Sequence, residues 1–163
     1  MLGYTVIKGE KSNRMKKILT VFTMLVLMIL IYAPVSVSAE IIDIDEAHFP
    51  DARFRKCISI YDKDEDEALS ESEIRNVTDL YVEEEGISDL TGIEYFTELL
   101  HFGCEDNDIR SIDLSKNVNL EFITCSNNKL SSLDLTQNTK LRLLQCDNNL
   151  LSTLNVNNNV YLA

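Results

Sequence analysis

Residues 62–73 have the composition and spacing of a calcium-binding loop. They read D-K-D-E-D-E-A-L-S-E-S-E, so acids stand at positions 1, 3, 5 and 12 of a twelve-residue loop. Ca²⁺ is a hard cation that binds carboxylate, carbonyl and hydroxyl oxygens, all of which this segment supplies. The predicted ligands are Asp62, Asp64, Asp66, the backbone carbonyl of Ala68, Ser70 directly or through a water molecule, and both oxygens of Glu73.

Position 6 of this loop departs from the pattern. Glu67 stands where calcium loops normally have a glycine, and the positive φ needed there costs another residue about 1 kcal/mol or more. Such loops usually occur in pairs and only one is present here, although extracellular modules use weak sites with dissociation constants of about 10⁻⁴–10⁻³ M. A metal-free interpretation is also open, because Ser70 and Glu73 form the S-x-x-E capping box of a helix–turn–helix cap.

A helix is expected immediately before the loop, at residues 50–61. Pro50 near its start and Asp51 in its first turn suit a helix N-terminus. Four side chains spaced at i, i+3, i+4 and i+7 share one face of this helix, namely Phe54, Cys57, Ile58 and Tyr61. We expect that face to cover the open edge of the repeats that follow, because the terminal repeat of a solenoid needs a cap.

From residue 99 onward the chain repeats with a period of 21 residues. Three copies begin at Leu99, Leu120 and Leu141, and each has a cysteine and an asparagine at fixed offsets among apolar positions. A degenerate copy, one residue longer, begins at Val77 and has Glu85 in place of the asparagine. The apolar columns predict a core shared between coils, and each coil is expected to contribute one short strand that pairs in parallel with the next.

The recurring asparagines are predicted to be structural. A side-chain amide both donates and accepts, so it can satisfy backbone groups of the neighbouring coil that would otherwise be buried and unpaired. This prediction covers two columns, Asn107, Asn128 and Asn149 in the first and Asn117, Asn138 and Asn159 in the second.

The cysteine column is predicted to be a buried ladder of free thiols. Cys104, Cys125 and Cys146 fill a position that is normally apolar, and they should stack about 4.8 Å apart. Side chains on parallel, in-register strands point the same way and are poorly oriented for a disulfide. Cys57 has no obvious partner, and the two histidines do not recur with the repeat, so no metal site of the cysteine and histidine type is expected.

The order of these parts resembles exported bacterial leucine-rich-repeat proteins of the internalin-like kind. The resemblance covers residues 41–163 and rests on Phe49-Pro50-Asp51, Phe54-Arg55, the loop at 62–73, and a repeat that ends Leu133-Asp134-Leu135-Thr136-Gln137-Asn138. It implies an α/β fold, a leucine-rich-repeat solenoid with short parallel strands on the concave face and a helical N-terminal cap. It also implies a surface or secreted protein that binds proteins or glycans, without naming the ligand.

Residues 1–39 predict a secretory signal peptide. Lys16 and Lys17 precede an uncharged apolar run at 18–32, and the small residues Val37 and Ala39 precede the expected cleavage point. The run is shorter than the about 20 residues of a membrane-spanning helix, so membrane contact is expected only during export, with an uncleaved anchor as the alternative. The predicted domains are the signal peptide at 1–39, a helical cap with an EF-hand-like loop at 40–76, and a solenoid at 77–163 with one degenerate and three full repeats that looks truncated at its C-terminus.

The net charge bears on the choice of partner. It is −12, and the acids are concentrated in the first half of the chain after residue 39. Such a surface repels nucleic acid and attracts cations or basic partners, while ordinary solubility is the alternative explanation.

The strand residues that point away from the core are predicted to form a binding surface. Three of them are apolar where the repeat requires no apolar residue, and an acidic column runs beside them. An apolar centre with a charged rim is typical of protein interfaces, so we expect a basic or amphipathic protein segment, or a glycan, as the ligand. The predicted contact residues are Tyr81, Glu83, His101, Glu105, Phe122, Thr124, Leu143, Gln145 and Asp147.

Catalysis is not expected from this surface. His101 and Glu105 share a face, but no further group converges on them, and an open concave face does not exclude water. The remaining alternative is a structural spacer that presents a further domain, possibly an enzyme, beyond residue 163.

Overall fold

The computed structural model describes residues 41–163, and the predicted signal peptide lies outside this range. The N-terminal part contains β1 (Ile42–Asp43), α2 (Ala52–Ile58), the 3₁₀ turn η1 (Ser59–Tyr61), β2 (Ala68–Leu69) and α3 (Glu71–Arg75). The repeats contain β3 (Asp79–Tyr81), the 3₁₀ turn η2 (Ile93–Tyr95), β4 (His101–Gly103), β5 (Phe122–Thr124) and β6 (Leu143–Gln145). Within the described range, no helix is long and apolar enough to cross a membrane.

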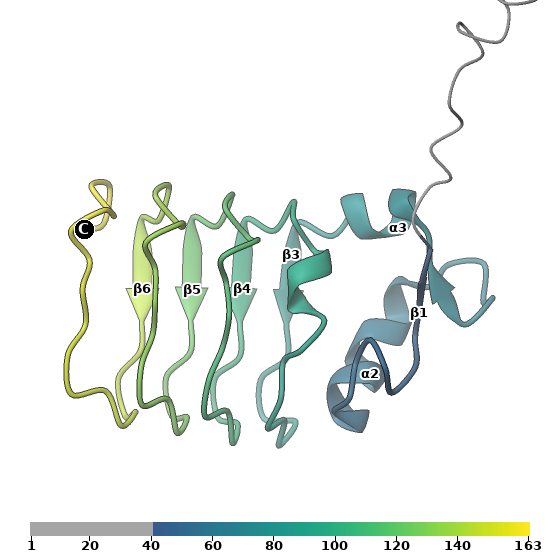
Figure 1. Ribbon diagram of the computed structural model, residues 1–163, viewed down its shortest axis with the longest axis horizontal. Coiled ribbons are helices and arrows are strands. Elements are labelled where there is room, and N and C mark those ends of the chain that lie inside the picture. Colours follow the sequence, from purple (N-terminus) through teal and green to yellow (C-terminus); the bar gives the residue numbers. More distant parts are fainter. Residues whose placement is uncertain (1–40) are drawn as a thin grey trace, which may run out of the picture. The chain divides into compact units, whose positions relative to one another are not determined.

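Each repeat contributes one strand to a parallel sheet with the order β3-β4-β5-β6, and the coils stack side by side (Figure 1). The registers align Asp79 with His101, His101 with Phe122, and Phe122 with Leu143. These pairs are the columns that the repeat predicts, so the alignment of the degenerate first copy with the three full ones is confirmed. The parallel solenoid predicted from the period is therefore the fold of this part of the chain.

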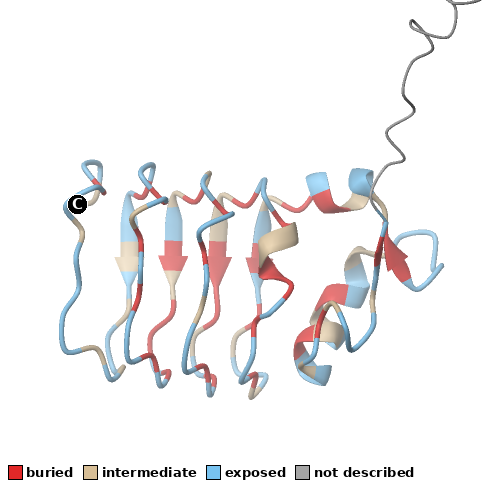
Figure 2. Cartoon of the chain, in the orientation of Figure 1, coloured by how far each residue is buried: buried red, intermediate tan, exposed pale blue. Residues whose placement is uncertain are grey.

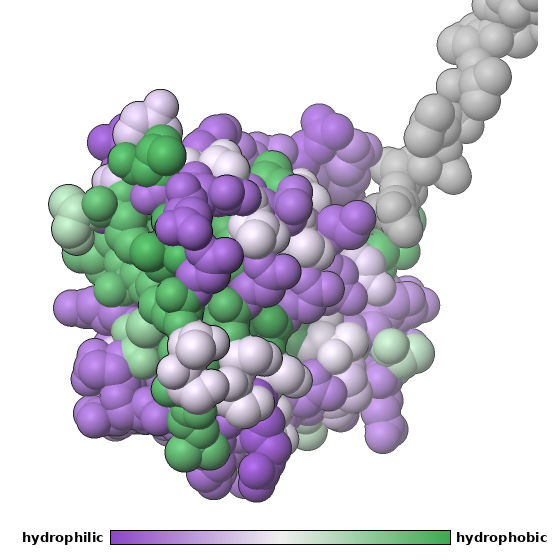
Figure 3. Space-filling view, turned by 60° about the vertical axis from the view of Figure 1, so that its left-hand side comes forward, coloured by the Kyte–Doolittle hydropathy of each residue, from purple (hydrophilic) through white to green (hydrophobic). Residues whose placement is uncertain are grey.

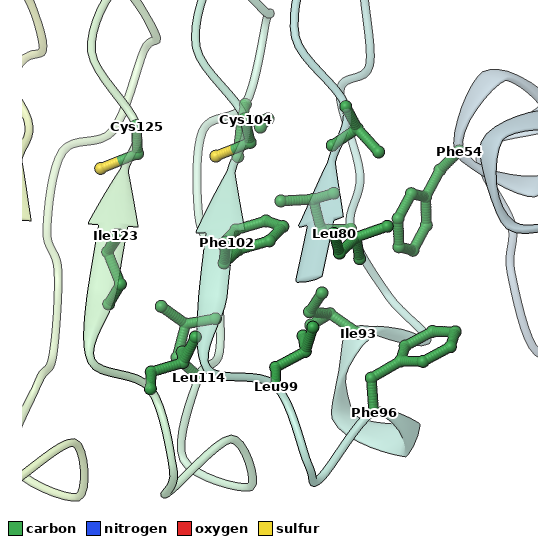
Figure 4. Packing of buried hydrophobic residues seen from close by; sticks show 14 of the residues in the cluster. Phe54, Leu80, Ile93, Phe96, Leu99, Phe102, Cys104, Leu114, Ile123 and Cys125 are labelled. Carbon is green, nitrogen blue, oxygen red and sulfur yellow. The ribbon is translucent and has the colours of Figure 1, made fainter. Parts of the chain in front are cut away.

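The middle residue of each strand points into the core. Figure 2 shows buried segments within β3, β4 and β5. Leu80, Phe102 and Ile123 are buried, and they pack between apolar residues from the other side of each coil, such as Leu99 and Leu114 (Figure 4). A β-strand alternates its side chains between two faces, so burial of the middle residue directs its two neighbours outward.

Burial weakens in the last coil. Leu144, Cys146 and Leu151 are only partly buried, although their equivalents in the two preceding coils are buried, and Leu154 is exposed. Figure 3, turned so that this end comes forward, shows the apolar surface that results. Leu154 belongs to an apolar repeat column that the sequence predicts to be buried; it is exposed because no other coil of the described residues packs against this end.

The N-terminal cap is a shorter helix than predicted. The α-helix spans 52–58, and the predicted residues 59–61 continue it as the 3₁₀ turn η1. Asp51 is its N-cap, accepting hydrogen bonds from the backbone of Arg53 and Phe54, and its second oxygen accepts from the backbone and hydroxyl of Ser88. One carboxylate therefore both starts the helix and fastens it to the first coil.

Apolar contacts complete the attachment of the cap. Phe54 is fully buried and lies beside Leu80 of the first coil (Figure 4). Gly92 has φ +105°, and a side chain there would overlap the ring of Phe49, so only glycine allows this approach. The predicted role of the helix as a cap on the first coil is confirmed.

The asparagines of the first column link each coil to the one before it. The Nδ2 group of Asn128 donates to the carbonyl of Cys104 at 2.8 Å, and its Oδ1 accepts from the backbone of Ile109 at 3.0 Å. Asn107 and Asn149 repeat this arrangement one coil earlier and one coil later. These side chains satisfy backbone groups inside the solenoid, as predicted.

The asparagines of the second column also link neighbouring coils, but only by donating hydrogen bonds. Asn138, for example, donates to the carbonyls of Leu114 and Asn117 of the preceding coil. Its Oδ1 is buried and unpartnered, as are those of Asn117 and Asn159. This column is therefore a one-sided ladder that satisfies carbonyls only.

The turn after each strand has a feature that the sequence analysis missed. Glu84, Asp106, Asn127 and Asn148 occupy equivalent positions and all have φ between 54° and 58°. Asparagine and aspartate tolerate this left-handed conformation better than other side chains. The signal was present in the sequence, because an asparagine or aspartate directly precedes the first-column asparagine in all three full repeats.

We predict that Asn128→Ala lowers the free energy of unfolding by about 2–3 kcal/mol, because the buried backbone groups of Cys104 and Ile109 lose their partner. Urea denaturation followed by circular dichroism measures the change. Gln137→Ala is the control, since Gln137 is exposed and its side chain makes no hydrogen bond within the described range; it should change stability by less than about 0.5 kcal/mol. Equal stability of the two variants would contradict the structural role of Asn128.

Candidate binding surface and calcium loop

The outward side chains of β3–β6 form a surface that we call the strand face. Its first row is Asp79, His101, Phe122 and Leu143, and its second row is Tyr81, Gly103, Thr124 and Gln145. A third row follows the strands and contains Glu83, Glu105, Ser126 and Asp147. The predicted contact residues therefore do lie together on one surface.

The apolar members of the strand face are accessible. Tyr81 is 58% exposed, and Phe122 and Leu143 are each 36% exposed. His101, Glu83, Glu105 and Thr124 are partly exposed, whereas Ser126 of the third row is buried. Large side chains with this exposure lie on a sheet face that no other part of the described chain covers.

His101 pairs with Asp79 and not with Glu105, the residue with which the sequence groups it. Its Nδ1 lies 2.5 Å from Asp79 Oδ1, and its ring meets Phe122 edge-on with centroids 4.8 Å apart. Hydrogen bonds from the Thr78 hydroxyl and from His101 lower the pKa of Asp79. The ring of His101 thus lies between Asp79 and Phe122 on the strand face.

A gap in the second row brings two side chains together. Gly103 carries no side chain, and a Cβ there would lie 2.4 Å from Glu83 Oε1 and 2.7 Å from Tyr81 Cδ1. The ring of Tyr81 and the carboxylate of Glu83 therefore both lean over Gly103. The sequence shows the glycine, but only the structure shows what occupies the space above it.

The three acids of the third row have no basic partner among the described residues. Within residues 41–163, no lysine or arginine forms an ion pair with Glu83, Glu105 or Asp147. Asp147 accepts a hydrogen bond from the Ser126 hydroxyl at 2.6 Å. Partial desolvation, together with the negative charge of Glu83, raises the pKa of Glu105. Such crowding favours the arrival of a cation.

The predicted calcium loop brings its first three acids together. One carboxylate oxygen each from Asp62, Asp64 and Asp66 lies within 4.8 Å of the others. Glu67 has φ +65°, the left-handed conformation that position 6 of such a loop requires. The backbone therefore adopts the expected turn in spite of the missing glycine.

The end of the loop is held by the predicted capping box. The Glu73 carboxylate accepts from the backbone of Ser70 at 2.9 Å, and the Ser70 hydroxyl accepts from the backbone of Glu73 at 3.3 Å. The other Glu73 oxygen accepts from the backbone of Lys63 near the start of the loop. Ala68, in β2, pairs with Asp43 of β1, so a strand of the same chain supports the loop.

Electrostatics within the loop are those of crowded acids. Desolvation first, and then the charges of Asp66, Glu73 and Asp62, raise the pKa of Asp64. Hydrogen bonds from the backbone of Lys63 and Ser70 lower the pKa of Glu73. The donor set is all oxygen, which suits calcium, and the same hydrogen bonds also suit a metal-free cap.

The predicted burial of the cysteine ladder is confirmed for Cys104 and Cys125 and is wrong for Cys146, which lies in the last coil. Cys104 and Cys125 are buried behind the sheet, Cys146 and Cys57 are partly exposed, and all four are free thiols. Burial raises the pKa of the Cys125 thiol to about 12, and it also raises the pKa of Cys104. The two buried thiols are therefore neutral and behave as small apolar side chains.

A shallow hollow of about 410 Å³ lies away from the strand face, between residues 89–94 and residues 111–116. Its carboxylates already cap turns: Asp89 accepts from Thr91, Glu94 from Gly92, and Asp113 from Ser115. Nothing in the hollow presents a free converging set of polar groups.

One strand per coil, a parallel sheet in register and asparagine ladders between coils define a leucine-rich-repeat solenoid. No family model and no curated protein sequence matches the chain. Solved structures do, and they include internalins of Listeria monocytogenes. The functional domain of InlJ, described as including a cysteine ladder, is 35% identical, has a TM-score of 0.72, and matches over 78% of this chain and 29% of its own.

Two further internalins support the fold. InlF is 27% identical with a TM-score of 0.66, over 73% of this chain and 36% of its own. Internalin C2 is 18% identical with a TM-score of 0.66, over 78% of this chain and 57% of its own, and so bears on the fold alone. The chain thus spans less than two thirds of each of these structures.

We predict that iodoacetamide at about pH 8.5 labels Cys57 and Cys146 before Cys104 and Cys125, because alkylation requires an accessible thiolate. Peptide mass spectrometry of a time course measures the order, and the protein in urea, where all four should react alike, is the control. Labelling of Cys125 as fast as Cys57 would contradict the buried ladder.

Because the folded pKa of Cys125 is raised from 9.0 to about 12, its contribution to stability is complete below pH 9 and is lost as the pH rises through 12.

Proposed function

We propose that this protein is an exported binding module that recognises another protein through the strand face. The observation that carries the proposal is the exposure of Tyr81, Phe122 and Leu143 on one sheet surface. Burying such side chains releases water from apolar area, and aromatic residues are the usual anchors of protein interfaces.

The chemistry of the surface supports a basic or amphipathic protein partner. Glu83, Glu105 and Asp147 flank the apolar side chains and lack counter-charges of their own. Complementary charge steers a basic partner toward the surface, and a strongly acidic protein disfavours nucleic acid. A glycan ligand remains the alternative, since aromatic side chains and carboxylates suit sugars as well.

Two further points shape the proposal. The strand face is open to solvent and its only histidine pairs with a single acid, an arrangement that supports binding rather than catalysis. Export, with a location on the cell surface or in secreted form, rests on the signal peptide predicted from residues 1–39. The competing proposal is a spacer that presents another domain, which would leave the strand face without a ligand.

The test is selection of peptides from a random display library on the full chain, followed by binding to a variant with Tyr81→Ala and Phe122→Ala together. We expect selected peptides to be rich in basic and apolar residues, and the double variant to weaken their binding by about tenfold or more. The matched control is Val160→Ala with Tyr161→Ala, which removes similar exposed apolar groups from a turn.

Either of two outcomes would count against recognition by the strand face. One is a set of peptides that binds the double variant as tightly as the original chain. The other is the recovery of no specific peptide at all, which favours the spacer. A glycan array on the same two variants would separate a sugar ligand from a peptide ligand.

We propose in addition that the loop at 62–73 binds calcium weakly. The close approach of the Asp62, Asp64 and Asp66 carboxylates and the left-handed Glu67 both favour this function. The ligands would be these three carboxylates with Ala68, Ser70 and Glu73. Metal binding would require Glu73 to turn its oxygens from the backbone of Lys63 and Ser70 toward the ion, a cost that points to a weak site.

Calorimetric titration of the full chain with CaCl₂ tests this proposal, and we expect a dissociation constant of about 10⁻⁴–10⁻³ M. Asp64→Asn should abolish binding, whereas Glu65→Gln, at an adjacent non-ligand position, should leave it unchanged. The affinity should fall as the pH is lowered through the raised pKa of Asp64, because the protonated acid is no ligand. The absence of heat at millimolar calcium would instead favour the metal-free cap.

A further inference from the structure

One part of the strand face is built differently from the rest. In the second row, Tyr81 and Glu83 lean over Gly103, and the Oγ1 of Thr124 lies 3.2 Å from the position of the missing Cβ. Tyr81 nevertheless remains 58% exposed, so much of its ring is open to solvent. The result is an exposed aromatic ring with a carboxylate beside it.

A second carboxylate completes this arrangement. Glu105 follows Gly103 by two residues, and its raised pKa reflects both partial burial and the charge of Glu83. Within residues 41–163 no lysine or arginine pairs with Glu83 or Glu105, and the charges that raise the pKa of Glu105 are those of Glu83, Asp106 and Asp147. Two like charges beside an aromatic ring, without a cation of their own, are complementary to a cation from outside the chain.

We propose that Tyr81, Glu83 and Glu105 bind an arginine side chain of the protein partner. This inference rests on the proposed function and deepens it by naming one side chain of the ligand and its place. The planar guanidinium stacks on an aromatic ring, and its fixed N–H groups donate to carboxylates in pairs. Phe122 and Leu143, in the adjacent row, then receive an apolar side chain next to that arginine in the partner segment.

The probes for the test are three capped amino acids of similar size, namely N-acetyl-arginine amide, the lysine analogue and the citrulline analogue. Citrulline keeps the shape of arginine without the charge. Each is titrated into the isotopically labelled full chain while the backbone amide signals of Tyr81, Gly103 and Glu105 are followed by NMR. We expect saturable shifts with arginine, affinity about threefold lower with lysine, and no saturable shift with citrulline.

Substitutions of single residues test whether the Tyr81 and Glu105 side chains bind the arginine probe. Glu105→Gln and Tyr81→Leu should each weaken arginine binding by about threefold or more, while Glu98→Gln, an exposed acid outside the strand face, should leave it unchanged. Binding should also weaken as the pH falls through the raised pKa of Glu105, because protonation removes a charge from the site.

Three results would overturn the inference. They are equal shifts with citrulline and arginine, equal affinity for lysine and arginine, and arginine binding that is insensitive to Glu105→Gln. Failure here is distinct from failure of the proposed function. If selected peptides depend on Tyr81 and Phe122 but contain no arginine, recognition by the strand face stands and the arginine site does not.

Discussion

The structure depends on hydrogen bonds to the buried backbone groups that lie between one coil and the next. In the described part of the chain, the interior backbone groups that lie between two strands of a coil are outside the hydrogen bonds of the sheet. Burying such a group without a hydrogen-bond partner is costly. The side chains of Asn107, Asn128 and Asn149 supply the missing donors and acceptors. Because each amide must reach both its own coil and the preceding one, the coils are locked at a constant stagger.

The strand face follows from that constant stagger. In-register strands stack equivalent residues into rows, so side chains far apart in the sequence become neighbours on one surface. The Asp79–His101–Phe122 series and the unneutralised acids at 83 and 105 are both consequences of this stacking. Such acids repel one another in the free protein, and a basic partner relieves this repulsion. The exposed aromatic side chains beside them also favour a partner, because its binding removes their apolar surface from water.

The N-terminal cap protects one end of the solenoid and joins it to the acidic loop. Asp51 fastens α2 to the first coil, while Tyr61, the last residue of η1, donates to the carbonyl of Asp79 at 3.0 Å. The loop at 62–73 begins directly after Tyr61 and returns through β2 to pair with β1. Any ion held in that loop would therefore stabilise the part of the chain that covers the apolar edge of the repeats.

The sequence by itself determined the period, the asparagine ladders, the position of the cap, and the buried and exposed columns of every coil but the last, because each of these depends on residue type and spacing along one chain. It also located the outward positions of the strand face. The partners of individual side chains were decided only by the tertiary structure. His101 pairs with Asp79 and not with Glu105, and Tyr81 and Glu83 meet over Gly103, because side chains from different coils compete for the same space. Spacing places residues in rows, but the sizes and charges of their neighbours in adjacent coils decide which of them touch.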